Sequence, residues 1–138
     1  MRQTSDRVFA DSNVLLYLLS DDARKKEIAK NILRSNPVIS TQVISENVNV
    51  LFKKFKILTF EQVMQHASLL SMGCIVLPLE LAIISKAFEI KSAYQFQWYD
   101  CTILAAAVNS QCNLIFSEDL QHGQVILGTL RVVNPFLP

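Results

Sequence analysis

The sequence has little of what flexible, fibrous or disulfide-stabilised proteins require. Its 138 residues include only 3 glycines and 4 prolines, which excludes a collagen-like repeat and leaves little room for linkers. Charged residues make up 18% of the chain and hydrophobic residues 51%, a balance that excludes intrinsic disorder. Because no repeat or change of composition marks a boundary, we expect a single domain over residues 1–138.

The cysteines are too few, and wrongly spaced, for a disulfide framework or a zinc site. Cys74, Cys101 and Cys112 are an odd number without a C-x-x-C pair, and neither histidine stands at a zinc-finger spacing from them. This pattern predicts buried free thiols in a reducing compartment. The first residues lack the apolar core of a secretory signal, and the uncharged stretch 101–117 is interrupted by polar side chains. We therefore expect a cytoplasmic protein with no membrane association.

The charges nearly cancel, with 13 Lys and Arg against 12 Asp and Glu. A net charge of +1 excludes a strongly basic nucleic-acid binder and an acidic tail as the basis of function. Any function that involves charge must therefore depend on where the charged residues lie.

Short apolar runs alternate with segments of helical period. The predicted strands are residues 7–10, 38–39, 74–78, 113–116 and 130–133. Helices are predicted over residues 22–34, 60–72, 79–94 and 98–111, and the helix 60–72 has a cap at Thr59 and a stop at Gly73. A further helix is capped by Thr41, and its apolar face consists of Ile44, Val48, Leu51, Phe52 and Phe55. Apolar strands separated by helices predict an α/β fold with a mainly parallel sheet covered on both faces. In such folds, ligands bind beyond the carboxyl ends of the strands.

Two acids in apolar surroundings stand out. Asp11 directly follows the first predicted strand, where a helix cap and a functional carboxylate explain it equally well. Asp100 lies 3 and 4 residues before Ile103 and Leu104, which places it on the inward face of its helix. Because a buried lone carboxylate is unfavourable unless it is paired or binds a metal, we favour a functional role for Asp100 over a structural salt bridge.

Three further acids are more ambiguous. Glu46 flanks the apolar stripe of its helix and, taken alone, fits a half-exposed surface acid. Glu118 and Asp119 follow a predicted strand, where a simple turn also explains them. An extended chain would turn Asp119 the same way as Ser117 and Glu118 the opposite way, which makes Asp119 the better inward candidate.

Carboxylates gathered at one sheet edge would repel each other unless cations neutralise them. Hard oxygen ligands without Cys or His select Mg²⁺ or Mn²⁺ rather than zinc. Such an ion stabilises the charge that develops on a phosphate during displacement, so metal-assisted phosphodiester hydrolysis suits these residues best.

Four segments, in order along the chain, resemble the motifs of PIN domains, and the likeness is closest to the VapC-type toxins of prokaryotic toxin–antitoxin pairs. These segments are residues 9–17 (FADSNVLLY), 40–46 (STQVISE), 99–107 (YDCTILAAA) and 114–123 (LIFSEDLQHG). The likeness runs from about Arg7 to Val133. One departure is Cys101, where the family more often has alanine.

The resemblance implies a three-layer α/β/α sandwich and a Mg²⁺- or Mn²⁺-dependent ribonuclease that cleaves RNA by metal-activated water. It implies a homodimer inhibited by a cognate antitoxin protein. The implied catalytic and metal-binding residues are Asp11, Glu46, Asp100 and Asp119, supported by Asn13 and Ser117. Asp11 and Asp100 would hold the metal most directly.

The RNA-contacting residues and the function itself have competing interpretations. Basic residues are concentrated between Arg24 and Lys56, and either a pair of solvated helix faces or an RNA footprint that includes Lys53, Lys54 and Lys56 explains them. The chain also fits a non-catalytic RNA- or antitoxin-binding module. A haloacid-dehalogenase-like phosphatase is a weaker alternative, because Asn13 stands where that mechanism needs a second aspartate.

Overall fold

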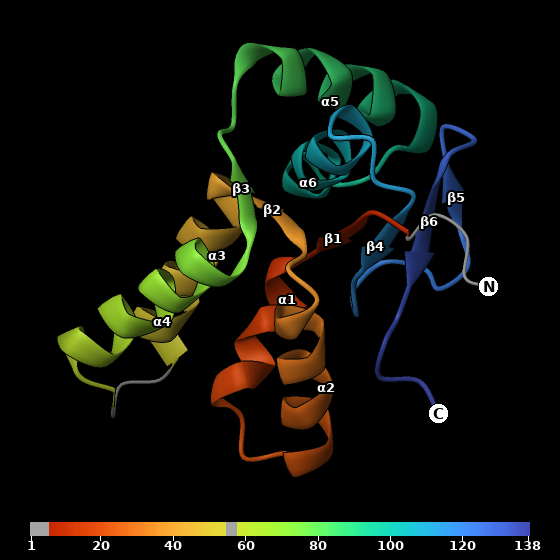
Figure 1. Ribbon diagram of the computed structural model, residues 1–138. Helices are drawn as coiled ribbons and strands as arrows, with labels where there is room; N and C mark the ends of the chain where they lie inside the picture. The colour runs from red at the N-terminus through yellow and green to blue at the C-terminus, as the bar shows by residue number, and fades with distance from the viewer. Residues whose placement is uncertain (1–5, 55–57) are drawn as a thin grey trace.

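A six-stranded sheet separates two groups of helices in the computed structural model, which describes residues 6–54 and 58–138 (Figure 1). The strands are β1 (Val8–Ala10), β2 (Val38–Ser40), β3 (Ile75–Leu77), β4 (Leu114–Phe116), β5 (Val125–Ile126) and β6 (Leu130–Val133). The helices are α1 (Ser12–Leu16), continued by a 3₁₀ turn (Tyr17–Leu19), α2 (Ala23–Arg34), α3 (Thr41–Lys54), α4 (Phe60–Gly73), α5 (Leu81–Tyr94) and α6 (Trp98–Asn109).

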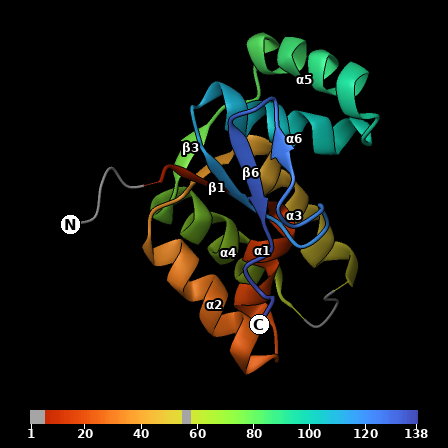
Figure 2. The ribbon, with the colours of Figure 1, turned by 90° about the vertical axis from the view of Figure 1, so that its right-hand side faces the viewer.

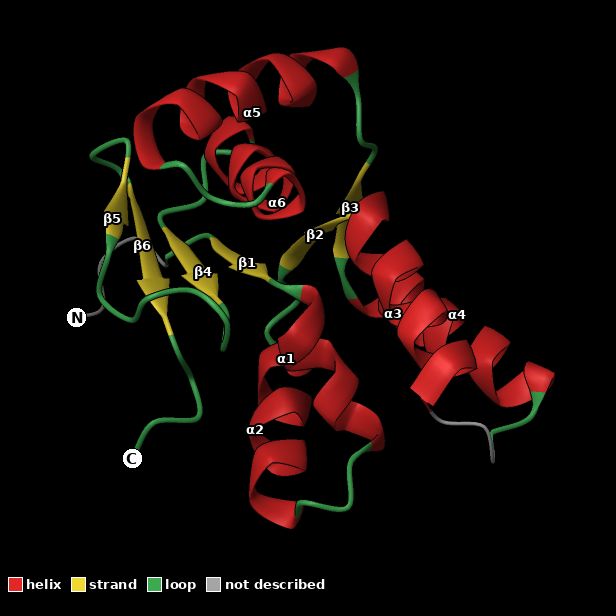
Figure 3. Ribbon diagram, turned by 180° about the vertical axis from the view of Figure 1, so that it is seen from behind, coloured by secondary structure: helices red, strands yellow, loops and turns green. Residues whose placement is uncertain are grey.

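The sheet is mainly parallel. Its strand order is β3-β2-β1-β4-β6-β5, and every neighbouring pair is parallel except β5 with β6. Helices α5 and α6 lie on one side of the sheet, and α1 and α2 lie on the other (Figures 1 and 3). The side view in Figure 2 shows the same separation. The α/β/α fold class predicted from the sequence is confirmed.

The core is built around α6 and the central strands. Every residue of α6 from Cys101 to Ala107 is buried, as are Phe9, Ile39 and Ile115 of the sheet. A helix that is apolar all round can lie only between other elements, here between the sheet and α5. All three cysteines are buried free thiols, as predicted. Within the described ranges, no helix is both long enough and apolar enough to cross a membrane.

Two predicted helix ends are wrong. Thr41 does not cap α3 but is its first residue, directly after β2, and its hydroxyl accepts a hydrogen bond from the Leu79 backbone N–H at 3.1 Å. Gly73 does not follow α4 but is its last residue. A Cβ on Gly73 would lie 3.0 Å from Leu33 Cδ1, so a larger residue here would require the Leu33 side chain on α2 to shift.

Other differences are smaller. Helix α5 begins at Leu81 and α6 ends at Asn109, each two residues inside its predicted range. The predicted apolar face of α3 is only partly correct, because Phe52 is 49% exposed while Val43 and Asn47 are buried. Phe55, the last residue of that predicted face, lies outside the described residues. The sequence pattern misses β5, which is too short to show a period, and it indicates α1 only through the possible cap at Asp11.

The predicted cap of α4 is confirmed as a reciprocal capping box. Thr59 Oγ1 accepts a hydrogen bond from the Gln62 backbone N–H at 3.1 Å, and Gln62 Oε1 accepts one from the Thr59 backbone N–H at 2.8 Å. This pairing satisfies two backbone donors that a helix start otherwise leaves unpaired.

We predict that Thr59→Ala lowers the free energy of unfolding by about 1 kcal/mol, because it removes the acceptor for the Gln62 N–H. Urea denaturation followed by circular dichroism measures the change. Thr59→Ser is the matched control and should lose much less, since it keeps the hydroxyl. Equal losses in the two variants would contradict the capping role.

Candidate active site

The carboxyl ends of β1 and β4 bring Asp11 and Ser117 together. Ala10 pairs with Phe116 in the parallel ladder, and the Asp11 backbone N–H donates to the Phe116 carbonyl at 2.9 Å. The chain following β1 crosses to β2 on one side, while β4 lies on the other, so the strand order reverses at this point. Such a switch point leaves a crevice beyond the strand ends, where open α/β sheets bind ligands.

Four carboxylates line one cavity of about 440 Å³ at this edge. They come from the end of β1, from α3, from the first turn of α6 and from the segment after β4. They are Asp11, Glu46, Asp100 and Asp119, the acids selected from the sequence. Asn13 also lines this cavity, while Ser117 is fully buried beside it. The structure therefore brings all of these residues together.

Asp11 is both a helix cap and a member of the cavity wall. Its Oδ1 accepts a hydrogen bond from the Ser12 backbone N–H at 2.7 Å, which caps α1. Its Oδ2 accepts from Ser117 Oγ at 2.9 Å and from Asn13 Nδ2 at 3.3 Å. The helix-cap explanation for Asp11 is thus confirmed for Oδ1, while Oδ2 is held by Ser117 and Asn13.

Burial dominates the electrostatics of Asp11. Burial is the main cause that raises the pKa of this carboxyl, and the negative charges of Glu46 and Asp100 add to the rise. The hydrogen bonds from Ser117 and Ser12 oppose it, and the resulting pKa is about 7. Near neutral pH, the carboxyl therefore carries a proton in a substantial fraction of molecules when no cation is present.

Asp100 shares this environment from the opposite wall. It is half-buried rather than buried, because its side chain opens onto the cavity. Burial raises its pKa, and the charges of Asp119 and Glu46 add to the rise. Among the side chains that the structure describes, which exclude that of Lys54, no lysine or arginine forms an ion pair with any of the four cavity acids. The salt-bridge explanation for Asp100 is therefore not seen in the described chain.

Glu46 is held from two sides. Its Oε1 accepts a hydrogen bond from Ser12 Oγ on α1, and its Oε2 accepts one from Gln42 Nε2 at 2.9 Å. The Gln42 Nε2 group also donates to the Tyr99 carbonyl at 3.3 Å, so Gln42 links Glu46 to α6. These contacts fix the carboxylate in place instead of leaving it free in solvent.

Hydrogen bonds between buried polar side chains of α3 and α4 support the N-terminus of α1. Asn47 is completely buried, and its Nδ2 donates to the carbonyls of Ser12 and Val43 at 3.2 and 3.1 Å. Its Oδ1 lies 2.8 Å from His66 Nε2, which must donate because that amide oxygen only accepts. Burial lowers the pKa of His66, so the ring stays neutral. The sequence prediction did not include Asn47 or His66.

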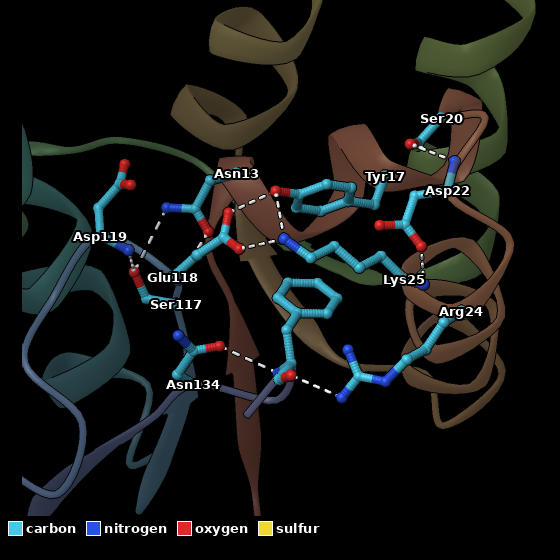
Figure 4. Close-up of polar contacts among 11 residues, drawn as sticks. Asn13, Tyr17, Ser20, Asp22, Arg24, Lys25, Ser117, Glu118, Asp119 and Asn134 are labelled. Carbon is cyan, nitrogen blue, oxygen red and sulfur yellow. Dashed lines mark hydrogen bonds and ion pairs between the residues drawn. The ribbon is translucent and has the colours of Figure 1, made fainter. Parts of the chain in front are cut away.

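Adjacent residues 118 and 119 have separate roles (Figure 4). Glu118 accepts hydrogen bonds from Tyr17 Oη at 2.6 Å and Lys25 Nζ at 2.9 Å, and it does not line the cavity. The same ammonium lies over the ring of Phe136, 5.3 Å from its centroid. The Glu118 backbone N–H donates to Asn13 Oδ1 at 3.0 Å, which ties the segment to α1. Glu118 is thus an anchor, and Asp119 faces the cavity.

The acids suit a hydrated divalent cation better than a closed metal centre. Across the described chain, no three His, Cys, Asp or Glu side chains stand close enough to enclose an ion. Mg²⁺ keeps several of its waters and is commonly held through one or two carboxylates, so it does not need such a cluster. The uncompensated burial of Asp11 and the mutual repulsion at Asp100 are the features that a divalent cation would relieve.

Comparison with known families identifies the class of protein. The PIN domain family matches residues 8–125, most of the chain, and the chain therefore belongs to the PIN domain family. The resemblance predicted from the four sequence segments is confirmed. A comparison with curated proteins gave no match.

Solved structures share the fold at low sequence identity. A toxin–antitoxin complex from Klebsiella pneumoniae has a TM-score of 0.71 at 20% identity, covering 94% of this chain and 98% of that one. The sarcin–ricin-loop-cleaving toxin VapC20 of Mycobacterium tuberculosis has a TM-score of 0.64 at 20% identity, with 81% and 89% covered. FitAcB from Neisseria gonorrhoeae has a TM-score of 0.64 at 15% identity, with 94% and 98% covered.

The sequence contains a further signal that the prediction missed, a polar stripe on the face of α3 that lies beside the cavity. Gln42, Ser45, Glu46 and Asn49 are spaced by 3, 4 and 7 residues, so they form a polar stripe on one helix face. That stripe lies beside the cavity. Glu118 has Tyr17 and Lys25 as partners. Both are about 100 residues away in sequence, so no comparable sequence pattern indicates these contacts.

The raised pKa of Asp11 predicts how stability depends on pH without divalent cations. Between about pH 4 and pH 7 the folded protein holds a proton that the unfolded chain has released. The free energy of unfolding should therefore fall as pH rises through this range, by on the order of a few kcal/mol. Urea denaturation in EDTA at several pH values measures this fall.

Asp11→Asn should flatten that dependence, because an amide does not titrate. Asp21→Asn, at an exposed position away from the cavity, should keep it. A wild-type protein equally stable in EDTA at pH 5 and pH 7 would contradict the prediction.

Proposed function

We propose that this chain is a Mg²⁺- or Mn²⁺-dependent endoribonuclease that acts as the toxin of a type II toxin–antitoxin pair. The observation that carries the proposal is the cavity at the β1/β4 switch point, where four carboxylates meet without a cationic partner in the described chain. Membership of the PIN domain family supports the nuclease class.

Each side chain has a distinct task in this proposal. Ser117 and Asn13 orient the Asp11 carboxylate, and Ser12 and Gln42 orient Glu46. Asp11 and Asp100 would hold a divalent ion, and Glu46 and Asp119 would hold water molecules beside it. When bound, such an ion would supply a Lewis acid for the attacking water and for the charge that develops on the phosphate. Because Asp11 must give up its proton to bind a cation, metal affinity should rise with pH around neutrality.

The RNA backbone needs cations outside the acidic cavity. Several basic side chains are already engaged: Lys25 with Glu118, Arg34 with Glu27, and Arg24 with the Phe136 carbonyl. Lys53 is exposed and continues the polar stripe of α3, four residues after Asn49. We propose Lys53 as a phosphate contact. The side chain of Lys54 and the whole of Lys56 lie outside the described residues, so these two remain sequence predictions.

The proposal includes a cognate antitoxin, a homodimer and a cytoplasmic location. A structural neighbour is described as a toxin–antitoxin complex, which supports the antitoxin partner. A second candidate function is a non-catalytic RNA- or antitoxin-binding module. The lack of a three-ligand metal cluster in the described chain favours that alternative, and the cleavage assay below separates the two.

Divalent cations should stabilise the folded protein, because they relieve repulsion among the cavity acids. We predict that millimolar Mn²⁺ raises the melting temperature measured by differential scanning fluorimetry, and that Asp11→Asn and Asp100→Asn reduce this rise. Glu118→Gln is the matched control, since its carboxylate binds Lys25 instead. A melting temperature insensitive to Mn²⁺ would show that the acids do not form a shared metal site.

Purified protein free of antitoxin should cleave single-stranded RNA in Mn²⁺ and not in EDTA. The products should carry 5′-phosphate and 3′-hydroxyl ends. Asp100→Asn should lower the cleavage rate at least about 100-fold, because it removes a charge that holds the cation. Sequencing of RNA ends after brief expression would locate the sites. If metal-saturated wild type leaves a broad RNA panel intact, the nuclease proposal fails.

A further inference from the structure

A second cavity adjoins the acidic one along the polar stripe of α3. Its volume is about 700 Å³, within the range of roughly 300–1,000 Å³ typical of small-ligand sites. Glu46 and Asn49 line both cavities, so the two are neighbours. A group bound in the second cavity would therefore lie beside Glu46, one of the four carboxylates.

The walls of this cavity combine hydrogen-bonding side chains with an aromatic ring. Ser45 and Asn49 are exposed, and Tyr99 from the first turn of α6 is 69% exposed. Gln42 is only 9% exposed, and within the described chain its Oε1 has no hydrogen-bond partner, although its Nε2 has two. A buried amide oxygen without a donor is unfavourable, and a ligand that donates a hydrogen bond would satisfy it.

We propose that this cavity binds a nucleobase of single-stranded RNA next to the phosphate that is cleaved. The base would stack on the ring of Tyr99, and its edge would meet the amides and hydroxyl of Gln42, Asn49 and Ser45. This inference rests on the proposed function and deepens it, because it assigns the residues that select the RNA sequence.

Three observations favour a base over the other parts of RNA. Among the described residues, those that line this cavity include no lysine or arginine, so it does not suit a phosphate. An exposed aromatic ring is the usual platform for an unstacked base. The Asn49 side chain offers a donor and an acceptor, and Gln42 offers its Oε1 as a further acceptor, the combination needed to read a base edge.

The polar wall also argues against a protein partner as the occupant. One exposed apolar residue, Leu79, lines this cavity, whereas Leu81 and Phe88 of α5 do not. Four of its polar residues come from one face of α3, namely Gln42, Ser45, Glu46 and Asn49. A contact between two copies of the chain would be unfavourable unless it supplied hydrogen-bond partners for these groups. Self-association through Tyr99 is the alternative outcome that the experiment detects.

The test uses the full chain in EDTA, where no cleavage occurs, with single-stranded RNA decamers that carry 2-aminopurine at successive positions. We expect fluorescence quenching at one position, as that base stacks. Tyr99→Ala should abolish this quenching and weaken binding roughly tenfold, while Tyr99→Phe keeps both. Met72→Ala, which removes an 85% exposed apolar side chain on α4, should change neither.

A second variant tests the reading of the base edge. Asn49→Ala should reduce the difference in affinity among decamers with A, C, G or U at the quenched position. Unfolding curves confirm that each variant folds, and sedimentation velocity reports its oligomeric state. The inference is overturned if Tyr99→Ala binds and quenches like wild type, or if it changes only the oligomeric state.

The experiments distinguish a failure of the proposed base site from a failure of the proposed nuclease activity. If the protein cleaves RNA in Mn²⁺ and Tyr99→Ala cleaves the same sequences at the same rate, the base site is wrong and the nuclease stands. If Mn²⁺ produces no cleavage but the Tyr99-dependent quenching is present, the base site stands and the nuclease fails.

Discussion

The parallel pairing of β1 with β4 is the constraint on which the candidate site depends. Because Ala10 lies beside Phe116, the residues that follow these strands, Asp11 and Ser117, leave the sheet as neighbours. The Ser117 hydroxyl then donates to the Asp11 carboxylate. A register shift of one residue would turn the side chains to opposite faces of the sheet and separate the two groups.

The same pairing places Asp11 where burial makes its charge unfavourable. Three hydrogen bonds orient the carboxylate, yet desolvation still dominates its pKa. The fold thus holds an acid that gains from a cation, with Glu46, Asp100 and Asp119 around the same cavity. With these four of its 12 acids gathered there, the rest of the chain carries 13 bases and 8 acids. A net charge near zero is therefore compatible with a protein that binds RNA.

Helix α3 connects the interior to the surface of the site. Its buried Asn47 holds the Ser12 carbonyl and receives the His66 ring, so α4 supports the start of α1 through a polar chain. On another face, the stripe that begins at Gln42 and includes Glu46 faces both cavities. Helix α3 therefore fixes the start of α1 and presents side chains both to the cavity with the four acids and to the adjoining cavity.

By itself, the sequence determined the α/β class, most helix and strand positions, the PIN family resemblance and the identity of the acids. These features follow from local periodicity and from short motifs, which need no knowledge of distant contacts. The cap at Thr59 was predictable for the same reason, whereas the end of α4 lies one residue later than predicted, at Gly73. Helix α1 was indicated only by its possible cap at Asp11, and strand β5 was missed, because their few residues do not complete a period.

Only the tertiary structure decided how the acids are used. The sequence had favoured Asp119 over Glu118 as the inward acid, but only the structure gave Glu118 its partners Lys25 and Tyr17, through contacts across about 100 residues. The tertiary structure raised the pKa of Asp11 through burial, which depends on packing from several elements. It also joined Tyr99 to the polar face of α3. Charge, solvation and cavity shape arise only when distant segments meet, and so a single sequence names these groups without fixing their roles.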